Sequence, residues 1–298
     1  MKNTLYALAC FNHIENISLI TSGLSQACFK VSADNKVYFA KTISDNIEAT
    51  VAECASKSTL SPSVIYHDQQ WLISNFIDAN NLASTTIKTT DKIVYAIKLM
   101  VRCHQLTAKP IDLAPTDIIN ELINKRPYSA RQKAQLRQLT ELILAPIDDI
   151  RAGVCCHGDL NFSNVLINQA QHTWLVDYEC ACIAPIEYDL AMFIAVNNLA
   201  SDEVSVIIAQ YQDQSSVSVD PQRLKHYLRF CYFINALWYF NTDKENMPIE
   251  NKQALLKHSK QQWYALQSSL KAYDSPLLSR LGIKLTNILA TLDLSNQA

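Results

Sequence analysis

The segment between residues 154 and 179 constrains the fold of this chain most strongly. Residues 157–164 read HGDLNFSN, and short apolar runs stand on both sides of this polar stretch. Another apolar run leads into Asp177, which follows Asp159 by 18 positions. Short apolar runs separated by polar residues predict strands joined by loops. We therefore predict two short β-pairs between residues 154 and 176, with carboxylates in the loops beside them.

The rest of the chain divides into a β-rich first third and a helical remainder. Short apolar runs bounded by turn residues predict strands at 17–20, 27–31, 37–42, 63–66 and 71–77. Helical periodicity predicts helices at 45–58, with Asp45 as a possible cap, and at 91–106, 117–124, 130–144, 185–199, 202–212, 221–240, 249–270 and 275–292. A polar stretch at 78–81 separates the two parts. We expect an α+β, two-lobed, protein-kinase-like fold, with a small β-rich N-terminal lobe over 1–77 and a larger, mostly helical C-terminal lobe over 78–298.

Composition excludes several classes of protein. The formal charge of −2 gives no basic surface for nucleic acid. The nine cysteines lack a disulfide framework in a chain of 298 residues, which predicts reduced thiols and a cytoplasmic location. The most apolar later stretch, 230–240, is far shorter than the ~20 residues that span a bilayer. We expect no membrane partner, and a monomer or homodimer.

The polar residues around the predicted strands suit phosphoryl transfer. This chemistry needs a carboxylate that takes the proton of the attacking hydroxyl, and oxygen ligands that hold Mg²⁺ against the triphosphate. The spacing Asp-x-x-x-x-Asn matches the catalytic loop of kinases. We predict that Asp159 is the catalytic carboxylate and that Asn164 and Asp177 are the metal ligands. The alternative is a polar loop with Asp159 and Asn164 as turn residues.

Residues 155–191 resemble the aminoglycoside phosphotransferase and choline kinase superfamily, with its H-G-D-x-x-x-x-N loop and D-[WF]-E metal motif. Within this superfamily, the sequence of these motifs is most similar to the bacterial choline, ethanolamine and thiamine kinase branch. Protein kinases match less well, because Asn161 replaces their loop Lys and Tyr-Glu follows Asp177. The resemblance implies a small-molecule kinase that uses ATP and Mg²⁺.

The resemblance also implies an ATP site in the N-terminal lobe. Residues 22–26, SGLSQ, stand where the family has G-G-L-S-N, which implies that Gly23 and Ser25 contact phosphate. The alternative is a plain hairpin turn. Asn75 and Ile77 resemble the hinge that holds adenine.

Lys41 resembles the lysine that contacts the α- and β-phosphates, with an exposed lysine at a strand end as the alternative. Its ion-pair partner should be a glutamate on the following helix. Glu48 is preferred to Glu53, because Val51 and Ala55 continue the apolar face beside it.

The acceptor site is predicted from an aromatic-rich helix at 221–240. Trp238, in an Ala-Leu-Trp sequence that resembles the G-L-W of choline kinases, and Tyr239 are candidates to contact a cation through their ring faces. Glu179 is the candidate for a negatively charged side chain that lines the acceptor site. The alternative is that these aromatics belong to the core.

Three functions are compatible with these residues. The first is an ATP-dependent kinase that transfers the γ-phosphate to a hydroxyl of a cationic alcohol of choline, ethanolamine or thiamine type. The second is an aminoglycoside or sugar kinase of the same superfamily. The third is an inactive kinase-fold protein that binds nucleotide or a partner, although Lys41, Asp159, Asn164 and Asp177 are all present.

Overall fold

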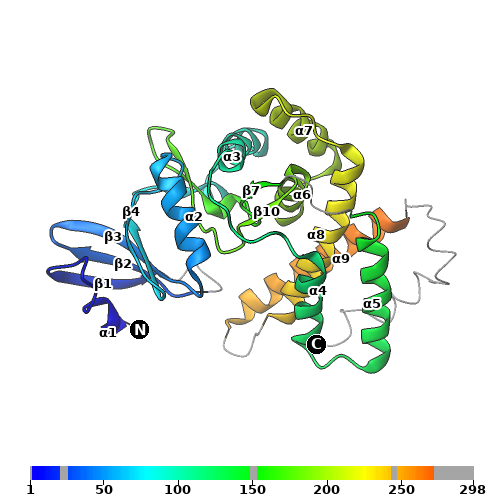
Figure 1. Ribbon diagram of the computed structural model, residues 1–298, viewed down its shortest axis with the longest axis horizontal. Coiled ribbons are helices and arrows are strands. Elements are labelled where there is room, and N and C mark those ends of the chain that lie inside the picture. The colour runs from blue at the N-terminus through cyan, green and yellow to red at the C-terminus, as the bar shows by residue number, and fades with distance from the viewer. Residues whose placement is uncertain (1, 21–25, 148–152, 243–246, 272–298) are drawn as a thin grey trace. The chain divides into compact units, whose positions relative to one another are not determined.

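The computed structural model describes residues 2–20, 26–147, 153–242 and 247–271 (Figure 1). These residues form two compact units, each assembled from segments that are distant in sequence. The first unit comprises Met1–Asp112, Gly153–Ala184 and Ala209–Val217, and the second comprises Leu113–Ala152, Pro185–Ile208 and Ser218–Ala298. The predicted lobe boundary after residue 77 stays a prediction.

An antiparallel sheet of five strands forms the first part of the first unit. Its strands are β1 (Ile14–Ile20), β2 (Cys28–Ala33), β3 (Lys36–Thr42), β4 (Val64–His67) and β5 (Trp71–Asn75), in the order β1-β2-β3-β5-β4. Asp34 and Asn35 join β2 to β3 with φ values of 52° and 60°. Two positive φ values suit the type I′ turn that matches the twist of a hairpin. All five strands were predicted from the apolar runs.

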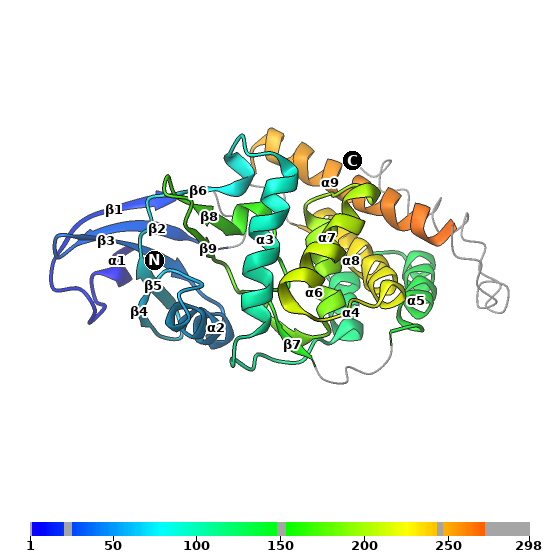
Figure 2. The same cartoon turned by 90° about the horizontal axis from the view of Figure 1, so that it is seen from above.

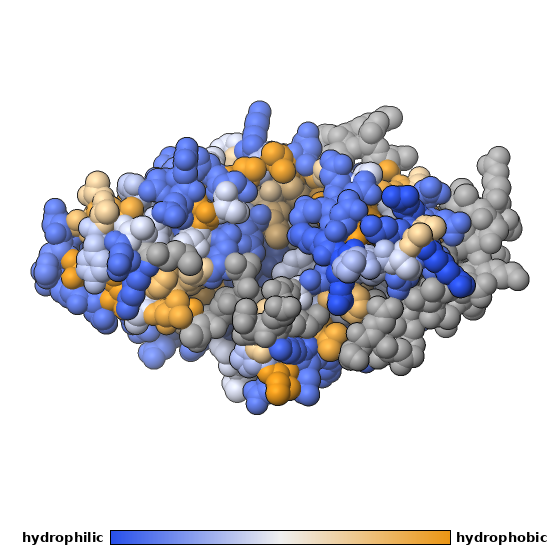
Figure 3. Space-filling view, turned by 90° about the horizontal axis from the view of Figure 1, so that it is seen from below, coloured by the Kyte–Doolittle hydropathy of each residue, from blue (hydrophilic) through white to orange (hydrophobic). Residues whose placement is uncertain are grey.

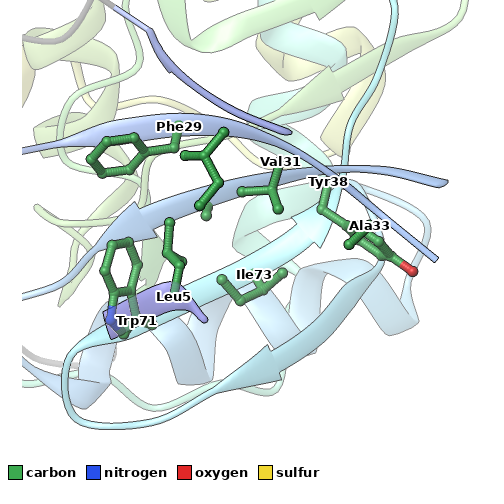
Figure 4. Close-up of a cluster of buried hydrophobic side chains, with 9 residues drawn as sticks. Leu5, Phe29, Val31, Ala33, Tyr38, Trp71 and Ile73 are labelled. Carbon is green, nitrogen blue, oxygen red and sulfur yellow. The ribbon is translucent and has the colours of Figure 1, made fainter. Parts of the chain in front are cut away.

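One face of this sheet carries a buried hydrophobic cluster (Figure 4). Leu5, the last residue of the short helix α1 (Lys2–Leu5), is completely buried against it. Figure 4 labels Leu5, Phe29, Val31, Ala33, Tyr38, Trp71 and Ile73 in this cluster. Because side chains alternate along a strand, Tyr38 and Ala40 of β3 face this cluster and Lys41 faces the opposite side of the sheet.

Helix α2 (Asn46–Lys57) follows β3 directly. The Asp45 carboxylate caps it by accepting a hydrogen bond of 2.8 Å from the Ile47 amide, as the sequence predicted. Such caps satisfy backbone donors that the first turn leaves without an intrahelical partner. Glu48 is buried on this helix together with Val51 and Ala55.

The remainder of the first unit holds short strands around the loop 157–164. It contains β6 (Asn80–Asn81), η1 (Leu82–Ser84), α3 (Thr89–His104), β7 (Val154–Cys156), η2 (Phe162–Asn164), β8 (Val165–Ile167), β9 (Thr173–Leu175) and β10 (Cys182–Ala184). Strands β8 and β9 form one predicted β-pair. The prediction of a second pair before residue 176 was wrong, because β7 pairs with β10. Three residues, Cys-Ile-Ala, are too few to show a strand pattern.

The second unit is helical. Its helices are α4 (Pro115–Asn124), α5 (Ala130–Leu144), α6 (Ile186–Val196), α8 (Pro221–Asn241) and α9 (Ile249–Lys271), while α7 (Ser201–Ser215) passes from this unit into the first. Helix α8 packs against α4, α5, α6 and α9 (Figures 1 and 2). Phe230 and Phe233 of α8 are completely buried there. The predicted helix at 275–292 lies outside the described residues.

The predicted fold class, a mixed α+β chain with a β-rich N-terminal sheet and helices after it, is confirmed. Within the described part of the chain, the helices are too short or too polar to cross a membrane. Hydrophilic side chains cover most of the face in Figure 3, and the hydrophobic side chains exposed there form separate groups.

Candidate active site

Lys41 lies at the centre of a group of charged side chains in the first unit. Its Nζ atom is 2.7 Å from Glu48 Oε1 and 3.6 Å from Glu179 Oε2, and it also donates a hydrogen bond to Asp177 Oδ1. Lys41 and Glu48 are both buried, at 5% and 3% exposure. Of the two glutamates considered on α2, Glu48 is thus the one that pairs with Lys41.

The other candidate, Glu53, forms an exposed ion pair on the same helix. Its carboxylate is 2.9 Å from Lys57 Nζ, one helical turn away. Glu53 is also 3.7 Å from His67. Helix α2 therefore contributes one glutamate to a buried ion pair and another to an exposed ion pair.

Ionisation of the buried pair depends on the balance between burial and charge. Burial lowers the pKa of Lys41, but the carboxylates of Asp177 and Glu48 raise it by more, so the ammonium stays charged. Burial raises the pKa of Glu48 to about 7, and the attraction of Lys41 offsets part of that rise. A lysine held in this way has a fixed position and a fixed charge.

His157 braces the loop that contains Asp159. The His157 Nδ1 atom accepts a hydrogen bond of 3.3 Å from the Asp159 amide, so that nitrogen carries no proton. The proton is then on Nε2, which lies 3.0 Å from the Val176 carbonyl and donates to it. His157 is completely buried. It joins the loop to the strand end before Asp177 and is not placed to act as a base.

Gly158 is required by a close approach of two chain segments. Its φ is 77°, in the left-handed region. A Cβ atom at this position would lie 2.1 Å from the Cys180 carbonyl oxygen. Glycine is the residue that adopts such a φ at low cost and leaves room for a neighbouring backbone. The loop containing Asp159 therefore passes directly against the residues that follow Asp177.

Two asparagines hold the Asp159 carboxylate. Asn161 Nδ2 donates to Asp159 Oδ2 at 3.1 Å, and its Oδ1 accepts from the amides of Ser163 and Asn164 at 2.9 and 3.2 Å. Asn164 Nδ2 donates to the Asp159 carbonyl at 2.9 Å, which leaves the Asn164 side-chain oxygen for another ligand. Sequence reasoning missed the role of Asn161, although Asn followed two positions later by Ser is a signal for a local side-chain turn.

Electrostatics in this region favour a cation. Burial raises the pKa of Asp159 to about 7; the hydrogen bond from Asn161 lowers it in part, and the charges of Asp177 and Glu179 add to the rise. The Lys41 ammonium is already shared among Glu48, Asp177 and Glu179. Carboxylate and amide oxygens are the ligands that Mg²⁺ prefers. The donor set of Asp177 and Asn164 thus fits a divalent cation.

The hinge candidates lie at the end of β5. The amides of Asn75 and Phe76 donate to the carbonyls of Ser63 and Val37, at 2.9 and 3.1 Å. Among the described residues, no hydrogen bond is found for the Ile77 amide. This amide is the backbone donor that the segment can offer to a ligand.

The phosphate-loop candidates Gly23 and Ser25 lie outside the described residues. Gln26 follows them, and its Nε2 atom is 3.3 Å from Glu179 Oε2. Glu179 therefore contacts both Gln26 and Lys41 within the first unit. Its assignment to the acceptor substrate stays a prediction.

The two aromatic candidates lie on α8 of the second unit. Trp238 is 39% exposed, while its neighbours Leu237 and Phe240 are buried. The rings of Trp238 and Tyr239 are 5.3 Å apart at 80°, and Tyr239 is 5.3 Å from His258 of α9. Trp238 is thus not a core residue, and its role in substrate binding stays a prediction.

Comparisons with known proteins identify relatives of this fold. Residues 96–227 match the model of a phosphotransferase enzyme family. No curated protein sequence matches the chain.

Three solved structures illustrate the likeness of fold. The choline kinase LicA from Streptococcus pneumoniae has a TM-score of 0.69 at 17% identity, over 90% of this chain and 97% of that protein. A choline/ethanolamine kinase family protein from Mesorhizobium loti has a TM-score of 0.63 at 16% identity, over 97% and 98% of the two chains. The spectinomycin phosphotransferase APH(9)-Ia, solved with ADP and spectinomycin, has a TM-score of 0.59 at 15% identity, over 85% and 94%.

The family model covers the whole of the loop 157–164 and the segment that follows it. The solved structures share the fold over most of both chains. The resemblance of this chain to the aminoglycoside phosphotransferase and choline kinase superfamily, predicted from its sequence, is therefore confirmed.

Proposed function

We propose that this protein transfers the γ-phosphate of ATP to a hydroxyl group of a small cationic alcohol of choline, ethanolamine or thiamine type. The observation that carries the proposal is the arrangement of Lys41, Glu48 and Asp177 in one hydrogen-bonded group. Asp159 and Asn164 lie on a loop that His157 ties to the strand end before Asp177. These are the parts that phosphoryl transfer requires.

Each residue has a distinct task in this mechanism. Lys41, held by Glu48, would contact the phosphates and neutralise part of their charge. Asp177 and the side-chain oxygen of Asn164 would hold Mg²⁺, which supplies further positive charge against the triphosphate when it is bound. Asp159, whose carboxylate is fixed by Asn161, would accept the proton of the acceptor hydroxyl.

The nucleotide would be held by backbone groups and by the residues around Gly23. The Ile77 amide and the Asn75 carbonyl offer the donor and acceptor that an adenine edge needs. Gly23 and Ser25 would approach the phosphates. The nucleotide-bound spectinomycin phosphotransferase has the same fold and supports the choice of a nucleotide.

The choice of a cationic acceptor depends on the exposed Trp238 of α8. Trp238 presents an accessible ring next to Tyr239, and ring faces attract cations. The choline kinase LicA and the choline/ethanolamine kinase family protein share the fold and support the same class of acceptor.

A panel of acceptors tests this function. ATP consumption with Mg²⁺ is measured for choline, ethanolamine, thiamine, an aminoglycoside and a sugar. We expect turnover with at least one of the first three compounds. Turnover with only an aminoglycoside or sugar would contradict the acceptor class and leave the kinase activity intact. Binding of ATP without turnover of any acceptor would contradict the kinase activity.

A further inference from the structure

A buried hydroxyl pair lies next to Asp177 in the first unit. Ser61 and Tyr178 are 6% and 1% exposed. Ser61 Oγ is 2.7 Å from Tyr178 OH and also 2.7 Å from the carbonyl oxygen of Leu175. A serine hydroxyl has one proton, and the Leu175 carbonyl accepts it at 2.7 Å. Tyr178 then donates to Ser61 at 2.7 Å, and its hydroxyl is also 3.5 Å from the Leu175 carbonyl oxygen.

This chain of hydrogen bonds encloses Asp177. Ser61 contacts residue 175 on one side of the aspartate and residue 178 on the other. The Leu175 amide also donates to the Leu60 carbonyl at 2.9 Å. The segment 60–61 thus holds Leu175 by both of its backbone groups and Tyr178 by its side chain.

The enclosed backbone has a conformation that needs such support. Asp177 has a φ of 73°, in the left-handed region where residues with a Cβ atom are disfavoured. Residues held in such regions persist when their surroundings fix them. On the N-terminal side, the Val176 amide donates to the Asn164 carbonyl at 3.0 Å and the Val176 carbonyl accepts from His157. On the C-terminal side, Ser61 accepts a hydrogen bond from the hydroxyl of the buried Tyr178.

The same hydroxyl pair connects Asp177 to the helix that carries Glu48. Ser61 follows the end of α2 at Lys57 by four residues. Lys41 binds both Glu48 of α2 and Asp177. Two connections therefore hold the residues around Asp177, one from α2 through Lys41 and one from the segment after α2 through Ser61 and Tyr178.

We propose that Tyr178 is a positioning residue whose hydroxyl, acting through Ser61, holds the Asp177 carboxylate in the direction needed to bind Mg²⁺. This inference rests on the proposed kinase function. The centroid of the Tyr178 ring is 5.0 Å from that of the His157 ring, and phenylalanine would keep this contact. The hydroxyl of Tyr178 alone takes part in this positioning, so removal of one oxygen atom tests it.

The test compares four variants with the wild-type protein: Tyr178→Phe, Ser61→Ala, the double variant and Ser61→Thr, which keeps a hydroxyl. Tyr38→Phe is the matched control, because Tyr38 is also a buried tyrosine of the first unit but belongs to the hydrophobic cluster on the other face of the sheet. The measurements are kcat for ATP turnover, the Mg²⁺ concentration that gives half of the maximal rate, and the melting temperature.

We expect Tyr178→Phe to lower kcat and to raise the half-saturating Mg²⁺ concentration by about three- to tenfold, the range of one net hydrogen bond. Ser61→Ala should give a change of the same kind. The double variant should lose no more activity than the more impaired of the two single variants, because both substitutions break the same connection. Ser61→Thr should restore most of the wild-type behaviour, and Tyr38→Phe should leave kcat and the Mg²⁺ requirement unchanged.

Unchanged kcat and Mg²⁺ requirement in both single variants would overturn the inference, and so would a loss of melting temperature alone, which indicates a purely structural contact. Full additivity of the two substitutions would also contradict it. Failure of the proposed function is distinguishable, because the wild-type protein would then turn over no ATP with any acceptor. If Tyr178→Phe does not fold, Ser61→Ala decides the question alone.

Discussion

At the scale of single residues, helix α2 carries one glutamate in a buried ion pair and one in an exposed ion pair. Glu48 holds Lys41 at 2.7 Å in a buried position, and Glu53 holds Lys57 at 2.9 Å at the surface. Surface pairs are screened by solvent and contribute little, whereas loss of one partner from a buried pair leaves a charge without compensation.

We therefore predict different results for two otherwise equivalent substitutions. Glu48→Gln should raise the Kd for Mg²⁺·ATP and lower kcat by about tenfold or more, because Lys41 loses the group that positions it. Glu53→Gln should change both by less than about twofold. Calorimetry and steady-state kinetics measure the two quantities. Equal effects of the two substitutions would contradict the role of Glu48.

The raised pKa of Asp159 predicts how the stability depends on pH. In the folded protein this pKa is about 7, mainly because of burial, compared with about 3.9 in an unfolded chain. Between these values the folded state holds a proton that the unfolded state has lost. Stability from this group is therefore complete below about pH 4 and decreases as the pH rises through about 7.

Asp159→Asn removes this pH dependence. Without metal or nucleotide, its melting temperature relative to the wild-type protein should be higher at pH 8 than at pH 5. The exposed Asp78→Asn substitution is the control and should show the same difference at both values. An Asp159→Asn difference that does not change between pH 5 and pH 8 would contradict the raised pKa of Asp159.

The sequence predicted some of these residues and not others, for physical reasons. The spacing of Asp159, Asn164 and Asp177 is a local pattern and was visible directly. The hydrogen bond of Tyr178 to Ser61 joins residues 117 positions apart, and no local pattern reports such a contact. The left-handed conformation of Asp177 likewise follows from its neighbours in space.

At the scale of elements, the aromatic helix α8 combines two kinds of ring. Tyr227, Phe230 and Phe233 are buried in the second unit, whereas Trp238 is 39% exposed. Periodicity predicted a helix at 221–240, and α8 covers Pro221–Asn241. Periodicity could not separate the rings of the core from the exposed ring, because nearly every position from Phe230 to Phe240 is apolar.

The exposure of Trp238 makes its proposed role testable without loss of the fold. Trp238→Leu should raise the KM for the acceptor by roughly tenfold or more, since a desolvated cation–π contact contributes about 2 kcal/mol. The melting temperature and the KM for ATP should change little. Tyr264→Leu, at an exposed aromatic of α9, is the matched control. An unchanged acceptor KM in Trp238→Leu would contradict the aromatic cation site.

Short strands were the least predictable elements. The strands β1 to β5 are apolar runs bounded by turn residues, so their positions followed from the sequence. Strand β10 has three residues and pairs with β7. The paired residues Cys182 and Cys156 are 26 positions apart in the sequence. The pairing of distant short strands depends on the whole fold and not on their own residues.

At the scale of the whole molecule, the order of a β-rich part followed by helices was enough to predict the α+β class. Local periodicity determines the kind of each element, and the position of the loop 157–164 among them determines where the carboxylates lie. The contacts that divide the chain into two units join segments far apart in sequence, such as Met1–Asp112 and Gly153–Ala184. Such a division has no local signal.

Phosphate transfer by Asp159→Asn tests the central claim most directly. Transfer of the γ-phosphate to the acceptor identified by the panel is measured in a single turnover for the wild-type and variant proteins, together with the Kd for Mg²⁺·ATP. We predict that the variant transfers phosphate at least about a hundredfold more slowly, because it lacks the group that accepts the hydroxyl proton, while its Kd stays within about threefold. Transfer at a rate near that of the wild-type protein would contradict the account.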